Sequence, residues 1–173
     1  MTSQQSTFLK SVFIALFLSV AGLSDVPAAT VNEGAYGLLK KQGESYFQKE
    51  SFAKAHEVYL KAQQLDLSPP DQRWVDFRVA DTQWRSYAGT NNPDRSKIEQ
   101  ARNKLKKIIR DRVRTEEQDR IWVEIQESLA DSWWFPGNVR NWSAAWAHYQ
   151  KALDWWGGAS DINLARTRYL NII

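Results

Sequence analysis

The residues best suited to acid–base chemistry are three acidic side chains, Glu124, Glu127 and Asp131, which lie at i, i+3 and i+7. This spacing puts all three carboxylates on one side of a helix. Paired carboxylates can hydrolyse glycosidic bonds, so a glycan-acting enzyme is one interpretation. Acidic helix faces that meet only solvent or a basic partner are far more common, and we favour that interpretation.

The only two histidines, His56 and His148, are the other side chains with catalytic or metal-binding potential. Neither has a Cys or a second His within one helical turn, whereas metal sites use clustered ligands at defined spacing. The sequence also lacks a Gly-rich phosphate loop after a strand and a Gly-x-Ser-x-Gly nucleophile motif. We therefore predict a protein that is not an enzyme and that uses no metal and no cofactor.

A recurring pattern of five residues marks the elements that carry these side chains. A small residue is followed by an acid, a hydroxyl residue, any residue and an aromatic residue at 43–47, 80–84 and 130–134, with a looser copy at 165–169. Self-similarity of this kind is the signature of a repeat architecture. Repeats built from helix pairs usually form binding surfaces rather than catalytic clefts.

Apolar residues fall at helical spacing in nearly every segment after Ala29, and no segment alternates with the period of a strand. We predict an all-α helix-turn-helix repeat, an α-solenoid with about three helix pairs plus a final helix, seven helices in total. Breaks are expected at Gln48–Ser51, Pro69-Pro70, Gly89–Pro93, Pro136–Asn138 and Gly157-Gly158. The predicted helices cover residues 36–47, 52–62, 71–87 (capped by Ser68 or Asp71), 94–113, 116–135 and 142–155, and a final helix capped by Ser160.

Residues 1–29 have the order of a secretory signal peptide. Lys10 precedes the apolar run Val12 to Leu23, and the small-residue site Val26–Ala29 follows. The run is shorter than the ~20 apolar residues of a membrane span, although an uncleaved N-terminal anchor is the alternative. We predict a periplasmic or secreted product that is cleaved near Ala29 and has no stable membrane span. Because the chain has no Cys, its stability must come from core packing.

The first helix pair resembles a tetratricopeptide repeat, and the third pair does so more loosely. The matching positions are Gly43, Tyr46, Phe52, Ala55, Tyr59, Ala62, Leu65 and Asp66, then Leu129, Ala130, Trp133, Ala145, Tyr149 and Ala152. The small residue lets two helices approach closely, and the aromatic residues fill the space between them. The resemblance implies that residues 30–173 form one tetratricopeptide-like domain, whose first helices line a concave groove.

Three stretches, at 74–81, 126–131 and 152–156, are similar to the N-terminal helical region of exported bacterial proteins of the alpha-2-macroglobulin family. That family traps proteases through a bait region, often with a Cys-Gln thioester, and this chain contains neither element. The resemblance implies that the chain is the N-terminal part of a longer protein. The fourth copy of the pattern has no second helix after it and ends on an apolar tail, which favours the same interpretation.

The predicted functional site is a partner-binding groove. Its centre is an aromatic row that ends the first three copies of the pattern, and polar residues flank that row. Such a surface suits a protein or peptide partner, or the remainder of the same longer chain. We expect Trp133, Trp142 and Trp155 to be core residues. The residues assigned to the groove are Lys40, Glu44, Phe47, Asp81, Trp84, Glu127, Asp131 and Trp134. The alternative is a periplasmic protein that binds or acts on cell-wall glycan through its Trp and carboxylate faces.

Residues 97–114 form the strongest charge feature, with eight basic residues against two acidic ones in a chain of net charge +3. Such a segment could bind nucleic acid, but the predicted export argues against that partner. The next segment, 116–131, is acidic. We expect the two segments to neutralise each other as stacked helices. An anionic membrane surface or cell-wall polymer is a second possibility.

Overall fold

The computed structural model describes residues 28–173, apart from 91, 113 and 136–139. The predicted signal peptide therefore lies almost entirely outside the described residues, as does the predicted turn at Pro136–Asn138. The described chain is helical throughout and contains no strand, which confirms the all-α prediction. The helices are α1 (Ala28–Gln48), α2 (Phe52–Ala62), α3 (Pro69–Ala88), α4 (Arg95–Ile109), α5 (Arg120–Trp134), α6 (Trp142–Gly157) and α7 (Ile162–Ile172), with a 3-10 turn at Thr115–Glu117.

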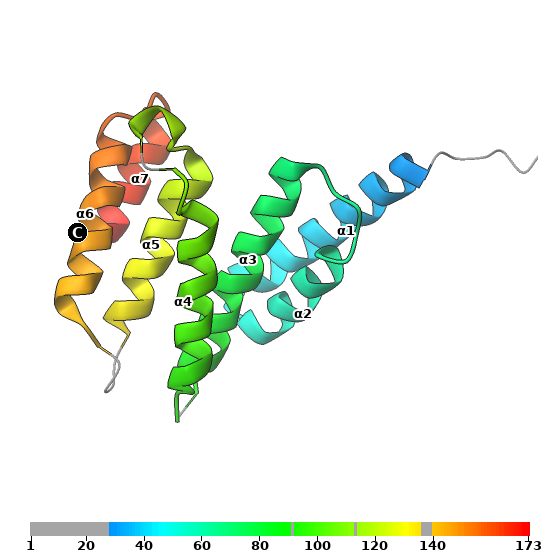
Figure 1. The fold of residues 1–173 in the computed structure, drawn as a ribbon, viewed down its shortest axis with the longest axis horizontal. Coiled ribbons are helices and arrows are strands. Elements are labelled where there is room, and N and C mark those ends of the chain that lie inside the picture. Colours follow the sequence, from blue (N-terminus) through cyan, green and yellow to red (C-terminus); the bar gives the residue numbers. More distant parts are fainter. Residues whose placement is uncertain (1–27, 91, 113, 136–139) are drawn as a thin grey trace, which may run out of the picture.

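Neighbouring helices form three pairs and a final helix, as predicted (Figure 1). α1 packs against α2, α3 against α4, and α5 against α6, while α7 packs against α6. The contacts of α2 with α3, and of α3 and α4 with α5, join one pair to the next. Within the described part of the chain, no helix is both long enough and apolar enough to cross a membrane.

Most helix starts follow from local sequence signals. The Ser68 side chain accepts a hydrogen bond from the backbone N–H of Asp71, and two prolines occupy the first turn of α3, where their missing N–H groups cost nothing. Asp94 and Asn141 cap α4 and α6 in the same way. The helix starts after these three caps are therefore determined within a few residues of sequence.

Several predicted boundaries are wrong. α1 begins at Ala28, eight residues before the predicted start at 36. The first helix of the third pair begins at Arg120 rather than 116, because Asp119 caps it and the preceding residues form the 3-10 turn. The final helix is capped by Asp161, whose side chain accepts from the N–H of Leu164, and not by Ser160. α4 ends at Ile109, four residues before the predicted end.

A tight turn and a small residue bring α1 and α2 close together. Glu50 has a φ of 55°. The N–H of Ser51 donates to the carbonyl of Tyr46, and the N–H of Glu50 to that of Phe47, which is a Schellman C-terminus. Gly43 faces the ring of Tyr59, and a Cβ on Gly43 would lie 2.4 Å from that ring. The small residue of the pattern is therefore required for the helices to approach.

The buried apolar residues form three separate clusters, each shared by neighbouring helices. The first lies between α1, α2 and α3 around Tyr59, and the second between α3, α4 and α5 around Leu105. The third lies between α5, α6 and α7 around Trp156. A chain of local cores is what a repeat architecture produces, because each pair buries its surface mainly against its neighbours.

Candidate functional site

The first helices of the successive pairs, α1, α3 and α5, together with α7, line a groove of about 480 Å³. Five of the eight residues predicted for the partner site lie in its lining: Glu44, Phe47, Asp81, Glu127 and Asp131. The other three, Lys40, Trp84 and Trp134, lie elsewhere.

In two of the three pairs, the acidic position of the pattern accepts a hydrogen bond from a tyrosine on the second helix of the same pair. The hydroxyl of Tyr59 on α2 donates to Glu44 on α1 at 2.5 Å, and that of Tyr149 on α6 donates to Asp131 on α5 at 2.7 Å. Burial first, and then the neighbouring carboxylate, raise the pKa of both tyrosines well above its ordinary value. The acid and the tyrosine thus recur together because they hydrogen-bond across each pair.

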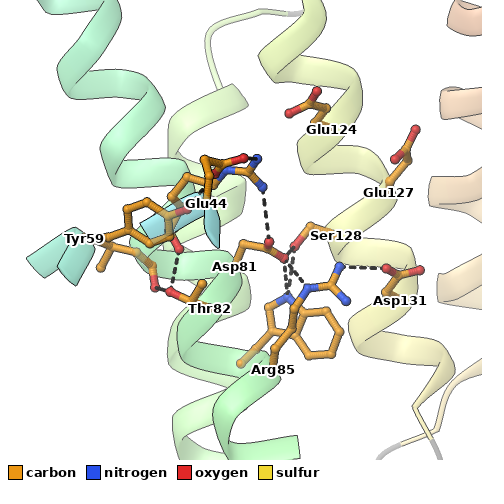
Figure 2. A network of polar contacts seen from close by, with 12 residues as sticks. Glu44, Tyr59, Asp81, Thr82, Arg85, Glu124, Glu127, Ser128 and Asp131 are labelled. Carbon is orange, nitrogen blue, oxygen red and sulfur yellow. Dashed lines mark hydrogen bonds and ion pairs between the residues drawn. The ribbon is translucent and has the colours of Figure 1, made fainter. Parts of the chain in front are cut away.

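The middle pair satisfies its acid differently. Leu105 lies where a tyrosine would be needed, and Asp81 is only 1% exposed. Instead, the Ser128 hydroxyl of α5 donates to Asp81 at 2.6 Å (Figure 2). The indole N–H of Trp84 donates to the same carboxylate at 3.1 Å. Trp84 also reaches the Ser128 oxygen at 2.9 Å.

The prediction that Trp84 is free to bind a partner is therefore wrong. Its side chain is 3% exposed and belongs to the core between α3, α4 and α5. The cause is the close approach of α5 to α3, which covers the ring and brings Ser128 within reach of its N–H.

Three arginines link the carboxylates of the groove. Arg85 binds Asp81 at 2.9 Å and Asp131 at 2.8 Å, so it joins α3 to α5 (Figure 2). Burial alone would lower the pKa of Arg85, but the two carboxylates raise it above its ordinary value. Arg78 makes the corresponding link from α3 to Glu44 on α1, at 3.0 Å.

At the other end of the groove, Arg168 of α7 binds Glu127 at 3.0 Å and Glu124 at 3.4 Å. The indole N–H of Trp156 also donates to Glu127, at 2.5 Å. Burial raises the pKa of Glu127, and these two partners offset that effect only in part. The three carboxylates of the i, i+3, i+7 pattern therefore lie in the groove, where Arg168 and Arg85 pair with them.

Lys40 and Trp134 lie outside the groove lining. The Lys40 ammonium lies 4.3 Å from the centre of the Trp74 ring. Trp134 is 46% exposed and meets Trp142 edge to face, with 4.1 Å between ring centres. Trp142 was expected in the core, but it is 53% exposed because it begins α6 at the end of the hairpin.

Sequence reasoning missed the arginines and the edge of the groove. Arg78 and Arg85 lie three residues before and four residues after Asp81, which is ion-pair spacing on a helix, so a search for such pairs would have found them. Glu50 and Phe52 also line the groove. They lie at the α1–α2 turn, and no local signal places them there.

The basic and acidic segments pair only where they meet in sequence, through Arg112 with Asp119 and Arg114 with Glu116 and Glu117, and not along the stacked helices α4 and α5 as expected. The α5 residues Glu124, Glu127 and Asp131 point into the groove, toward α3 and α7. The opposite side of α5, with Trp122, Gln126 and Leu129, lines a second cavity that it shares with α4 and α6. The basic residues of α4 therefore meet the side of α5 that has no carboxylates.

Among the described residues, no group of three or more His, Cys, Asp or Glu side chains could hold a metal ion. His56 contacts the carbonyl of Val79 at 3.1 Å and the hydroxyl of Thr82 at 3.2 Å, and burial lowers its pKa. These contacts hold α2 against α3.

No family model matches the chain, and no significant match is found among curated proteins or solved structures. The tetratricopeptide and alpha-2-macroglobulin resemblances stay predictions from the sequence.

Proposed function

We propose that this chain is an exported, non-enzymatic helical-repeat module that binds a protein or peptide segment in its concave groove. The observation that carries the proposal is the charge of the groove. Its lining has six carboxylates and three guanidinium groups, in a chain whose net charge is +3. An acidic groove in a basic protein favours a cationic partner and selects against an acidic one. The charged lining residues are Glu44, Glu50, Asp81, Glu124, Glu127 and Asp131, with Arg78, Arg85 and Arg168.

Several of these carboxylates stay accessible despite their internal partners. The side chains of Glu44 and Asp131 are 31% and 36% exposed, and Glu50 is exposed at the edge. Phe47 and Phe52 supply an apolar end, with their rings 5.4 Å apart. A segment with a Lys or Arg side chain for the carboxylates and an apolar side chain for the phenylalanines fits this arrangement.

The ion pairs between the helices also support binding. Arg85 and Arg78 tie three helices together, so the groove keeps its shape without a ligand. A preorganised site loses less entropy when it binds.

Selection of peptides from a random library on the folded chain tests this proposal. We expect the selected peptides to be enriched in Lys and Arg. Glu50→Lys should weaken their binding by about tenfold or more. Glu57→Lys is the matched control, because this substitution makes the same change of charge. Glu57 is exposed on α2 and does not line the groove. Neutral or acidic selected peptides, or equal affinity in the two variants, would contradict the proposal.

We also propose, from the sequence resemblance, that the module belongs to a larger alpha-2-macroglobulin-like protein that traps proteases. The exposed apolar side chains of α7 support a contact with the rest of that protein, since Ile162, Tyr169 and Leu170 are 76%, 41% and 59% exposed. An antibody against the helical domain should detect a native product much larger than this chain. A native product of the size of this chain would refute the larger protein but leave the groove proposal standing.

The exposed tryptophans favour cell-wall glycan binding as the second candidate function. Trp134, Trp142 and Trp146 are 46%, 53% and 62% exposed, and the Arg140 guanidinium lies 4.8 Å from the Trp142 ring centre. Aromatic faces of this kind can stack on sugar rings. If the chain sediments with insoluble peptidoglycan, and Trp142→Ala and Trp146→Ala remove that binding while Glu50→Lys does not, this candidate replaces the groove proposal.

A further inference from the structure

A cavity larger than the groove lies on the other side of α5. α4 and α6 both pack on α5 but make little contact with each other, and the space between them has a volume of about 1130 Å³. Five basic side chains from three segments line it, against two acidic ones. They are Lys106, Arg110, Arg112, Arg120 and Lys151, with Asp154 and Asp161.

The two carboxylates of this cavity do not neutralise its lysines. Asp161 accepts a hydrogen bond from the N–H of Leu164 as the cap of α7, at 3.0 Å. Asp154 accepts from the side chain of Gln150 on its own helix, at 3.1 Å. Both acids therefore interact with neighbouring groups of the backbone or side chains on α6 and α7.

The basic groups divide into paired and unpaired ones. Arg112 binds Asp119 at 3.5 Å, and Arg120 binds Glu124 at 2.9 Å. Lys106 on α4 and Lys151 on α6 form no ion pair with any described residue. Two like charges on facing walls repel each other, and a bound anion would remove that repulsion.

The walls between these lysines are aromatic and polar. The half-buried Trp155 is held by its indole N–H, which donates to the carbonyl of Gln118 at 3.1 Å. The Nδ1 atom of His148 lies 2.7 Å from the side-chain amide oxygen of Gln126. Burial, and after it Lys151 and Lys106, lower the pKa of His148 to about 4. The field of both lysines thus reaches the wall of the cavity.

We propose that this cavity binds a ligand that carries at least two phosphate groups, with its charge between Lys106 and Lys151 and its less polar part against Trp155. Lysine binds phosphate as a point charge, so two lysines on opposite walls suit two phosphate groups. The volume of about 1130 Å³ exceeds the ~300–1,000 Å³ of ordinary small-molecule sites. The cavity and the groove lie on opposite sides of α5 and have opposite charge, so this proposal does not depend on the proposed function.

Calorimetric titration with inorganic pyrophosphate at constant ionic strength tests the proposal. We expect binding, and we expect Lys106→Gln combined with Lys151→Gln to weaken it by about tenfold or more. Lys41→Gln combined with Lys61→Gln is the matched control, because it removes the same charge at a distance from the cavity. Lys41 and Lys61 are exposed on α1 and α2. Thermal unfolding of the parent and the two double variants checks that each variant is folded.

The pKa values of the two histidines supply a second readout, which reports whether pyrophosphate binds in this cavity. Pyrophosphate should raise the pKa of His148, measured by NMR, toward its ordinary value of about 6.5, while His56 in the other half of the chain stays unchanged. Equal shifts of the two histidines, no pyrophosphate binding, or equal loss in the two double variants would overturn the proposal.

The source of the phosphate groups needs a separate experiment. Sedimentation with vesicles that contain cardiolipin, whose headgroup carries two phosphate groups, compared with phosphatidylcholine vesicles, distinguishes a lipid headgroup from a soluble ligand. If the cavity variant loses vesicle binding and the control variant keeps it, the ligand is a headgroup. If both variants bind the vesicles like the parent while the cavity variant alone loses pyrophosphate, the ligand is soluble.

Discussion

The charged side chains on the two sides of α5 differ in whether they have partners within the protein. In the groove, nearly every carboxylate has a partner within the protein: a tyrosine hydroxyl, an arginine, a serine or an indole N–H. In the cavity between α4 and α6, Lys106 and Lys151 have no ion-pair partner among the described residues. The comparison shows that the density of charge alone does not identify a ligand site. Internal partners hold the groove carboxylates in place and leave only their accessible oxygens for a ligand, whereas unpaired groups of one sign attract a ligand with their full charge.

The largest effect is expected for Asp81→Ala, at the centre of the groove network. This change leaves Arg85, Ser128 and the indole of Trp84 without their shared acceptor in a buried place. Removing one partner of a buried pair costs about 3–5 kcal/mol, and urea unfolding should show that loss of free energy of unfolding.

Asp131→Ala is the matched comparison, because Asp131 also binds Arg85 but is 36% exposed. It should cost about 1 kcal/mol. If the two variants lose the same free energy of unfolding, the burial of a carboxylate does not decide how much it stabilises this groove.

The second effect is a pH dependence that arises from the cavity. An unfolded His148 titrates at its ordinary pKa of 6.5, whereas in the folded chain its pKa is about 4. Its contribution to stability is therefore complete above the unfolded value and is lost as pH falls from there through the folded value. We expect a loss on the order of 2 kcal/mol over that window, measured by urea unfolding.

His148→Gln isolates this contribution from other titrating groups, such as Asp119 and His56, whose pKa values are also lowered. The variant should lose less stability on acidification than the parent does. Parallel curves for the two proteins would show that the environment of His148 has no effect on stability.

A third and smaller effect concerns the hydrogen bond within the first pair. Tyr59→Phe removes the hydroxyl that donates to Glu44 and keeps the buried ring. Because Glu44 retains Arg78, we expect a loss of about 1.5 kcal/mol. Chemical denaturation measures this loss, and an unchanged midpoint would show that the acid of the pattern does not need its tyrosine.

The smallest effect sharpens the comparison from the other side. Lys106→Gln with Lys151→Gln removes two like charges from the lining of one cavity, so the free energy of unfolding should stay constant or rise by about 0.5 kcal/mol. A loss like that of Asp81→Ala would mean that the lysines are structural, and that the cavity resembles the groove after all.

Local signals were sufficient for much of the fold. The caps Ser68, Asp94 and Asn141 and the close approach at Gly43 each depend on residues within one helix pair or one turn. Five of the eight residues predicted for the groove do lie in it, because the pattern places them on the inner side of the first helices. The positions of Trp84 and Trp142 could not be predicted, because they depend on how far one pair covers the next.

By itself, the sequence determined the seven helices and the contacts inside each helix pair, because the helical period and the caps act over a few residues. It also determined which residues form the acidic and basic segments. Only the tertiary structure decided where those charges point. The rotation of α5 about its axis depends on packing against α3, α4 and α6 at once. That rotation turns its carboxylates into the groove and leaves Lys106 of α4 and Lys151 of α6 lining a cavity on its other side.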